Sequence, residues 1–172
     1  PGIPDQSHLW YQASKLGMPI STPSTGEVVG GNAARQVIEA VADTPVILEH
    51  FGLLRVPEEQ WEYSFQSFLT LSDNANVYVK LHGFGEFNQR PFPAQNPPFD
   101  LSSVPNYIDR AAMAFGCERL MIATDYPPSS SREGYANVLN LIKSYLSSWS
   151  TAQQDAILGG TASQIFGFQK MT

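Results

Sequence analysis

The sequence predicts an α/β protein built on a parallel sheet of the (β/α) TIM-barrel type. Four short apolar runs, each followed by a loop and at least one amphipathic segment, indicate strands that are buried on both faces. These runs lie near residues 18–22, 46–50, 76–82 and 119–125. Repeated strand–helix units of this kind require parallel pairing and right-handed crossovers. No glycine-rich dinucleotide motif follows any run, which favours a barrel over a doubly wound sheet.

We therefore expect residues 1–172 to form a single partial barrel domain of about four βα units, half of an eightfold barrel. The strand near 119–125 is the clearest. Its residues Leu120 to Ala123 form an unbroken apolar run without helical period. Pro127 and Pro128 cannot continue a central ladder, so this strand must end just before them.

The other three strands are predicted from their β-branched and aromatic residues. The first contains Pro19, which fits a strand start better than a strand interior. The second ends in Glu49 and His50. The third alternates at its end, which places Lys80 and His82 on the same face.

Apolar residues recur at helical spacing before, between and after the strands. We expect helices at 5–16, 32–42, 57–68, 105–116 and 135–146, followed by two short helices near the carboxyl terminus. Residues 24–31 and 129–132 are expected to be loops. Caps and stops are expected from Gly17, from Asn32, and from the capping boxes Ser150/Gln153 and Thr161/Gln164.

The longest irregular stretch lies between Gly83 and Val104 and contains four prolines and four phenylalanines. A loop of this length in a compact domain is usually functional or mobile. Its aromatic residues could form a lid or pocket wall, or could fill a gap in the surface. Arg90 in this loop, and Arg132 in a later one, could bind a substrate carboxylate through two parallel hydrogen bonds or could have no such role.

The composition indicates a globular protein. The chain is 42% hydrophobic and 15% charged, which is too apolar for disorder. Its net charge of −6 and its ten scattered Lys and Arg residues argue against a nucleic acid or an anionic membrane as partner. The single cysteine, Cys117, excludes an internal disulfide and is compatible with a cytoplasmic location. No apolar run reaches membrane length.

Ionisable side chains end three consecutive predicted strands: His50, then Lys80 and His82, then Asp125. The carboxyl ends of barrel strands share one face, so these residues are expected to become neighbours. Imidazole and carboxylate groups are suitable ligands for a first-row metal. They are equally suitable as electrophile and general base when water attacks an acyl carbon.

Each of these residues also has a structural alternative. Asp125 could form a turn or cap a helix, and His50 or His82 could be hydrogen-bonded within a turn. Lys80 could form an ion pair with Glu49 on the neighbouring strand.

The chain contains, in this order, the segments VILEHFG, NVYVKLHG, FGCERLMIATDYPPSSSREGY and ILGGTASQIFGF. This order resembles the amidohydrolase-related (amidohydrolase 2) metal-dependent hydrolases, a barrel family that includes lactonases and decarboxylases. The resemblance covers most of residues 1–168. Its most specific part surrounds Asp125 and is similar to the family signature fGxdRlmfGSDwP; the His50 segment is similar to vvlDHlG.

The resemblance implies a role for each matching residue. Asp125 matches the aspartate of the last barrel strand, which activates the hydrolytic water and, in metal-containing members, also binds the metal. His50 matches a strand-end histidine that contacts substrate or metal. Lys80 matches a lysine common in this branch, and His82 replaces a common Ser or Thr, which implies a branch-specific contact.

The chain also departs from the family pattern. The His-x-His pair of the family's first strand is absent, because the three histidines are His8, His50 and His82. Counting back from the last strand as the eighth makes the strand at 18–22 the fifth, so the chain resembles the carboxyl-terminal half of the barrel. Thr22 stands where metal-rich branches have another histidine, which weakens the expectation of a metal.

Together these observations predict a hydrolase fragment, inactive alone, whose complete form cleaves a small carboxylated ester, lactone or amide. Asp125 would take the proton from water, and His50 would polarise the carbonyl group. His82, Arg90 and Lys80 would bind the substrate. The cofactor is either one divalent metal such as zinc, bound by His50 and Asp125, or none. The alternatives are a zinc-dependent decarboxylase, or a non-catalytic half-barrel whose open sheet edges pair with a second copy or with a missing amino-terminal half.

Overall fold

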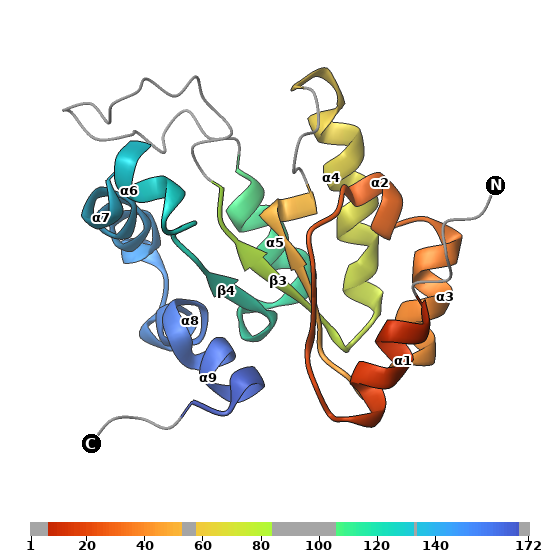
Figure 1. Ribbon diagram of the computed structural model, residues 1–172. Helices are drawn as coiled ribbons and strands as arrows, with labels where there is room; N and C mark the ends of the chain where they lie inside the picture. Colours follow the sequence, from red (N-terminus) through yellow and green to blue (C-terminus); the bar gives the residue numbers. More distant parts are fainter. Residues whose placement is uncertain (1–6, 53–57, 84–105, 133, 169–172) are drawn as a thin grey trace. The chain divides into compact units, whose positions relative to one another are not determined.

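The computed structural model describes residues 7–52, 58–83, 106–132 and 134–168 (Figure 1). The chain forms two compact units. Unit 1 runs to Lys80 and takes up the chain again at Ala162, and unit 2 comprises Leu81 to Thr161.

Four strands form one sheet in the order β1-β2-β3-β4, which confirms the predicted α/β fold. The strands are β1 (Ile20–Thr22), β2 (Val46–Glu49), β3 (Val77–Leu81) and β4 (Leu120–Ile122). Pairing is parallel between β1 and β2 and between β2 and β3, and Glu49 lies opposite Lys80 in the register. Beyond the end of β4, the backbone N–H of Ala123 donates to the carbonyl of Leu81 at 3.0 Å. Parallel pairing brings the carboxyl ends of β1, β2 and β3 to one edge of the sheet.

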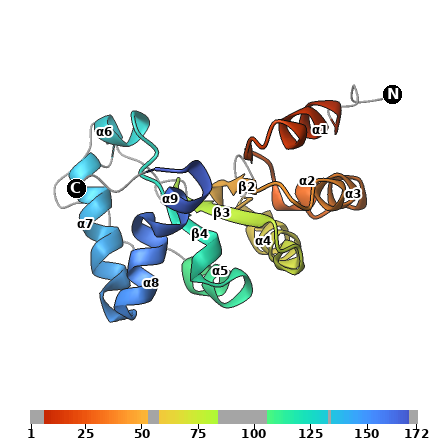
Figure 2. The ribbon, with the colours of Figure 1, turned by 90° about the horizontal axis from the view of Figure 1, so that it is seen from below.

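Unit 1 comprises β1, β2 and all but the last residue of β3, together with the helices connected to them. Its helices are α1 (Ser7–Lys15), α2 (Gly26–Val29), α3 (Asn32–Ala40) and α4 (Trp61–Leu69), with short 3₁₀ turns η1 (His50–Gly52), η2 (Glu58–Gln60) and η3 (Thr70–Asp73). The core side chains are fully buried and come from both strands and from α4; they include Val46, Leu48, Val77, Val79, Phe65 and Phe68. Helix α2 lies against α4 in both views of the ribbon (Figures 1 and 2).

Unit 2 has its own core around β4. Its helical elements are α5 (Tyr107–Phe115), η6 (Cys117–Arg119), α6 (Pro128–Arg132), α7 (Tyr135–Tyr145), η7 (Leu146–Ser148), α8 (Thr151–Asp155) and η8 (Ala156–Gly160). The buried side chains include Ala111, Leu120, Ile142, Leu146 and Ile157. Helix α9 (Thr161–Phe166) follows η8 and leads the chain into the carboxyl-terminal part of unit 1.

Several helix ends agree with the sequence. Gly17 follows α1 with φ +65°, and Gly116 follows α5 with φ +78°, the left-handed conformations that favour glycine at a helix stop. The Ser150/Gln153 capping box is present, with Ser150 Oγ accepting from the Gln153 backbone N–H at 3.3 Å. These ends were predictable because each depends on local chemistry alone.

Other local predictions were wrong. Helix α2 occupies part of 24–31 because Thr25 caps it, accepting a hydrogen bond from the Val28 backbone N–H. Helix α6 likewise replaces the loop predicted at 129–132. The cap of α3 is Gly31 rather than Asn32, which is already helical. Thr161 donates to the carbonyl of Glu118 at 3.1 Å, so its hydroxyl joins two elements of unit 2 instead of opening a capping box.

Some predicted features lie outside the described residues, namely Pro57, Pro105 and most of the loop between Gly83 and Val104, including Arg90. In the part of the chain that the structure describes, no helix is both long enough and apolar enough to cross a membrane.

Candidate active site

The residues that follow β2 have an unusual backbone conformation. His50, Phe51 and Gly52 form the turn η1 with φ values of +55°, +55° and +66°. A left-handed conformation costs a non-glycine residue roughly 1–2 kcal/mol, and here two consecutive residues adopt it. Phe51 is fully buried, so its packing offsets part of this cost. His50 is half-buried at the start of the turn.

Glu49 and Lys80 form an ion pair at the paired ends of β2 and β3. Lys80 Nζ donates to Glu49 Oε1 at 2.7 Å, and Ser21 Oγ of β1 donates to the same oxygen at 2.5 Å. Both charged side chains are about one-fifth exposed, at 23% for Lys80 and 20% for Glu49. Lys80 therefore forms the ion pair with Glu49 that the sequence offered as the alternative to a substrate contact. A substrate contact remains a prediction for Lys80, and would use the donors that Glu49 leaves available.

A second group of polar side chains lies in unit 2. There His82, which follows β3, contacts Asp125, which follows β4. His82 Nδ1 is 3.5 Å from Asp125 Oδ1, and the side chains are 6% and 24% exposed. His82 immediately follows β3, whereas Asp125 lies three residues beyond β4 with φ +58°. The Asp125 carbonyl accepts from the Ser129 backbone N–H at 3.0 Å, which ties this turn to the start of α6.

This geometry suits proton transfer. A carboxylate beside an imidazole is a pair in which one group can accept a proton while the other orients it or stabilises the resulting charge. The contact is a true ion pair only when His82 is protonated. The Asp125 side chain is partly exposed, so a water molecule can reach its carboxylate. A general base requires such access.

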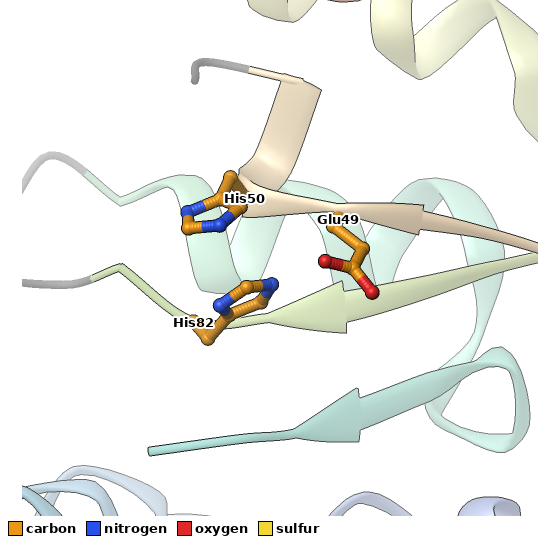
Figure 3. A group of neighbouring side chains, drawn as sticks. All are labelled: Glu49, His50 and His82. Carbon is orange, nitrogen blue, oxygen red and sulfur yellow. The ribbon is translucent and has the colours of Figure 1, made fainter. Parts of the chain in front are cut away.

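Residues of the types that bind metals also occur at these strand ends. Glu49 and His50 of unit 1 and His82 of unit 2 each offer one possible ligand atom for a metal (Figure 3). In the figure His50 follows the end of β2, and His82 follows the end of β3. Two imidazoles and a carboxylate form a donor set used by catalytic zinc sites, so these residue types fit a divalent cation.

The structure thus groups the predicted residues differently from the sequence argument. The predicted metal ligands were His50 of unit 1 and Asp125 of unit 2, and their meeting at one rim stays a prediction. The same holds for His50 and His82, because His82 also belongs to unit 2. Glu49 was considered as a partner of Lys80 but not as a ligand. The Glu-His dipeptide at the end of a buried strand was the signal that could have indicated it.

Comparison with known proteins identifies the family. The uncharacterised protein y4mH of Sinorhizobium fredii is 24% identical over 124 residues, which cover 72% of this chain and 39% of that protein. An amidohydrolase of Burkholderia multivorans with bound HEPES has a similar fold, with a TM-score of 0.75 and 17% identity over 97% of this chain and 59% of that one. A second crystal form of that amidohydrolase contains zinc and gives a TM-score of 0.72, with 18% identity over 97% of this chain and 58% of that one.

Two further solved structures differ in the chemistry that their names describe. A Pseudomonas putida protein, provisionally described as a 2-pyrone-4,6-dicarboxylic acid hydrolase, has a TM-score of 0.73 and 20% identity, covering 99% of this chain and 61% of that one. The 5-carboxyvanillate decarboxylase of Sphingomonas paucimobilis has a TM-score of 0.58 and 13% identity, covering 94% of this chain and 52% of that one.

These likenesses cover only part of each known protein, since the chain spans 39% of the curated relative and about three-fifths of the first solved structures. At such identities the solved structures establish the fold. The family itself follows from the match of residues 5–168 to the amidohydrolase family, which covers almost the whole chain. The chain therefore belongs to the amidohydrolase family.

Proposed function

We propose that the protein containing this chain is a hydrolase that cleaves a small carboxylated ester, lactone or amide. The observation that carries the proposal is the 3.5 Å approach of His82 Nδ1 to Asp125 Oδ1 beyond the ends of β3 and β4. In α/β barrel enzymes the carboxyl ends of the strands are where catalytic groups lie. The family match supports the reaction class.

In this mechanism Asp125 is the general base. Its carboxylate takes one proton from water as the water oxygen bonds to the acyl carbon. The acyl–oxygen or acyl–nitrogen bond then breaks, and the same proton passes to the leaving group. His82 orients the Asp125 carboxylate and compensates its charge when the imidazole is protonated. His50 polarises the carbonyl oxygen of the substrate.

A carboxylated lactone is the substrate class that the similar structures favour, because the name of the Pseudomonas putida protein includes a pyrone dicarboxylic acid. Cationic side chains would bind the carboxylate groups. Arg90 is the stronger candidate, since a guanidinium can form two parallel hydrogen bonds with a carboxylate. Lys80 is the weaker candidate because Glu49 already neutralises much of its charge.

A divalent metal such as zinc fits the donor groups of this chain. Glu49 and His50 would hold it together with His82, or His50 would hold it with Asp125, provided that the two units bring these residues together. When bound, such an ion polarises carbonyl oxygens and lowers the pKa of water. Lys80 would then lose part of its contact with Glu49, so metal affinity should increase when Lys80 is replaced by a neutral residue.

Decarboxylation is the second candidate function. It is favoured by the similarity to 5-carboxyvanillate decarboxylase and by two histidines among the potential metal ligands. Both candidates act on a small molecule. A cytoplasmic location is part of the proposal and is supported by the single cysteine, Cys117, which leaves no internal disulfide to form. The remaining alternative is a half-barrel that acts only by assembling with a second copy or with an amino-terminal half.

One pair of assays separates these functions. The intact protein is incubated in ¹⁸O-water with 2-pyrone-4,6-dicarboxylate and, separately, with 5-carboxyvanillate, before and after chelation of metals. Hydrolysis predicts one ¹⁸O atom in the ring-opened product and no release of CO₂. Release of CO₂ that chelation abolishes would favour the decarboxylase. If neither compound reacts and the protein is a stable oligomer by light scattering, assembly becomes the better explanation.

A further inference from the structure

Three backbone segments of unit 1 meet at the hydroxyl group of Ser64. Ser64 Oγ accepts a hydrogen bond from the Gly26 backbone N–H at 3.0 Å and donates one to the Gly52 carbonyl at 3.0 Å. Ser64 is only 3% exposed, so neither bond competes with bulk water. One side chain on α4 therefore connects the start of α2 to the end of the η1 turn.

The segments approach too closely for ordinary side chains. A Cβ atom added to Gly26 would lie 1.8 Å from the Ser64 carbonyl oxygen. A Cβ atom added to Gly52 would lie 2.9 Å from Phe68 Cδ2 and 3.0 Å from the Gly26 nitrogen. Because the backbones touch here, a shift of α2 or α4 is transmitted directly to the η1 turn.

This turn determines where His50 points. Its three residues have positive φ, so its conformation is intrinsically unfavourable for His50 and Phe51 and must be held by its surroundings. The burial of Phe51 holds the middle of the turn, and the hydrogen bond from Ser64 holds its last carbonyl. His50 is the first residue of the same turn, so its backbone shares the conformation that these contacts support.

We propose that Ser64 is a positioning residue that fixes His50 through the η1 turn. The importance of this role for catalysis rests on the function proposed above for His50. Ser64 does not touch the reacting atoms. It acts because a hydroxyl group can accept one hydrogen bond and donate another at the same time. Alanine does neither and would leave the buried N–H of Gly26 and carbonyl of Gly52 without this partner.

The first test is nuclear magnetic resonance of the whole chain with labelled histidine, phenylalanine and glycine. Three variants are compared with the parent: Ser64→Ala, Ser64→Thr, and the matched control Ser67→Ala in the same helix. We expect Ser64→Ala to shift the backbone carbon resonances of His50 and Phe51 away from left-handed values. We also expect the Gly26 amide to exchange with solvent about tenfold faster, as the loss of one buried hydrogen bond implies. Ser64→Thr should restore both signals, and Ser67→Ala should change neither.

Unchanged His50 and Phe51 resonances in folded Ser64→Ala would overturn the proposal. If Ser64→Ala does not fold, Ser64→Cys keeps the side-chain volume with a weaker donor, and the same shifts must then appear in that variant. Normal resonances in Ser64→Cys, with fast exchange confined to Gly26, would contradict the link to His50.

The second test uses the intact protein with 2-pyrone-4,6-dicarboxylate. Ser64→Ala should lower kcat about tenfold and leave KM within about twofold, because a misplaced catalytic group loses rate more than binding. Ser64→Thr should recover most of the rate. If the parent protein has no hydrolytic activity but the resonances of Ser64→Ala move as expected, the proposed function fails and the positioning role stands. Equal kcat values for Ser64→Ala and its parent would show that Ser64 does not contribute to catalysis.

Discussion

The turns that follow β2 and β4 share one feature but are supported in different ways. Both place a non-glycine residue at positive φ next to a polar strand end: His50 at +55° and Asp125 at +58°. The turn of His50 is held by contacts that are distant in sequence, through buried Phe51 and through Ser64. The turn of Asp125 is closed locally, because its carbonyl accepts a hydrogen bond from the Ser129 N–H.

This difference predicts which substitutions should disturb each turn. Strained conformations of non-glycine residues occur mostly at functional positions and persist only when the surroundings impose them. The His50 turn should therefore respond to substitutions far away in the sequence. The Asp125 turn should respond mainly to substitutions at Asp125 itself and in α6.

The largest stability effect should follow from removing the aromatic side chain that fills the His50 turn. Phe51→Ala should lower the free energy of unfolding by about 3–5 kcal/mol, because Phe51 is fully buried and a cavity would remain. Denaturation with urea measures the change. Phe166→Ala is the control, since that side chain is 41% exposed and its loss should cost less than about 1 kcal/mol. Similar losses for both variants would show that the turn does not depend on Phe51.

A smaller effect should follow from Gly52→Ala, which combines an unfavourable φ with a close contact. We expect a loss of about 1–3 kcal/mol in unfolding free energy. Gly17→Ala is a matched control, because Gly17 has φ +65° but no atom within 4 Å of an added Cβ. The difference between the two variants isolates the contact with Phe68 and Gly26. Equal losses would mean that these neighbours move aside without cost.

Replacing Asp125 by glycine should change the stability in the opposite direction. Asp125→Gly should stabilise unit 2 by up to about 1 kcal/mol, because glycine adopts positive φ without steric cost, partly offset by its greater entropy when unfolded. Asp125→Asn should leave stability unchanged within about 0.5 kcal/mol, since asparagine tolerates this conformation similarly. Thermal unfolding of both variants tests the expectation. A loss of stability in Asp125→Gly would show that the contact with His82 outweighs the strain.

The smallest effect concerns a polar contact away from the strand ends. Tyr145 donates to Asp109 Oδ2 at 2.8 Å, and burial, followed by the interaction with Asp109, raises the pKa of Tyr145. The folded state therefore holds this proton more tightly than the unfolded state does. Its stabilising contribution is complete below the ordinary tyrosine pKa of about 10 and is lost as pH rises above it. Unfolding at increasing alkaline pH should show a shallower loss for Tyr145→Phe than for the parent, and parallel curves would contradict this assignment.

Local sequence signals predicted the strands and many helix ends. The run from Leu120 to Ala123 is sufficient to identify β4, because it is apolar throughout and ends before two prolines. The same reasoning placed His82 and Asp125 at strand ends, where the structure brings them within 3.5 Å of each other. The short helices α2 and α6 were missed, since four or five residues carry too little periodicity to be recognised.

The support of the His50 turn was not predictable from the sequence. Positive φ is uncommon for non-glycine residues, and although histidine adopts it more readily than most, at Phe51 it depends on tertiary packing. The sequence contained one weak indication that Ser64 is buried and bonded. It is a polar residue among Trp61, Phe65 and Phe68 on the apolar face of a helix. Its two backbone partners lie 38 and 12 residues away, so spacing alone could not identify them.

The most direct test of the proposed mechanism is the rate of the intact protein when Asp125 loses its charge. Asp125→Asn should lower kcat for 2-pyrone-4,6-dicarboxylate, or for the substrate that replaces it, by about 10²–10⁴ while changing KM only a few fold. Asp155→Asn, at an exposed position of α8, should leave kcat unchanged. A kcat for Asp125→Asn equal to that of the parent would contradict the role of Asp125 as the general base.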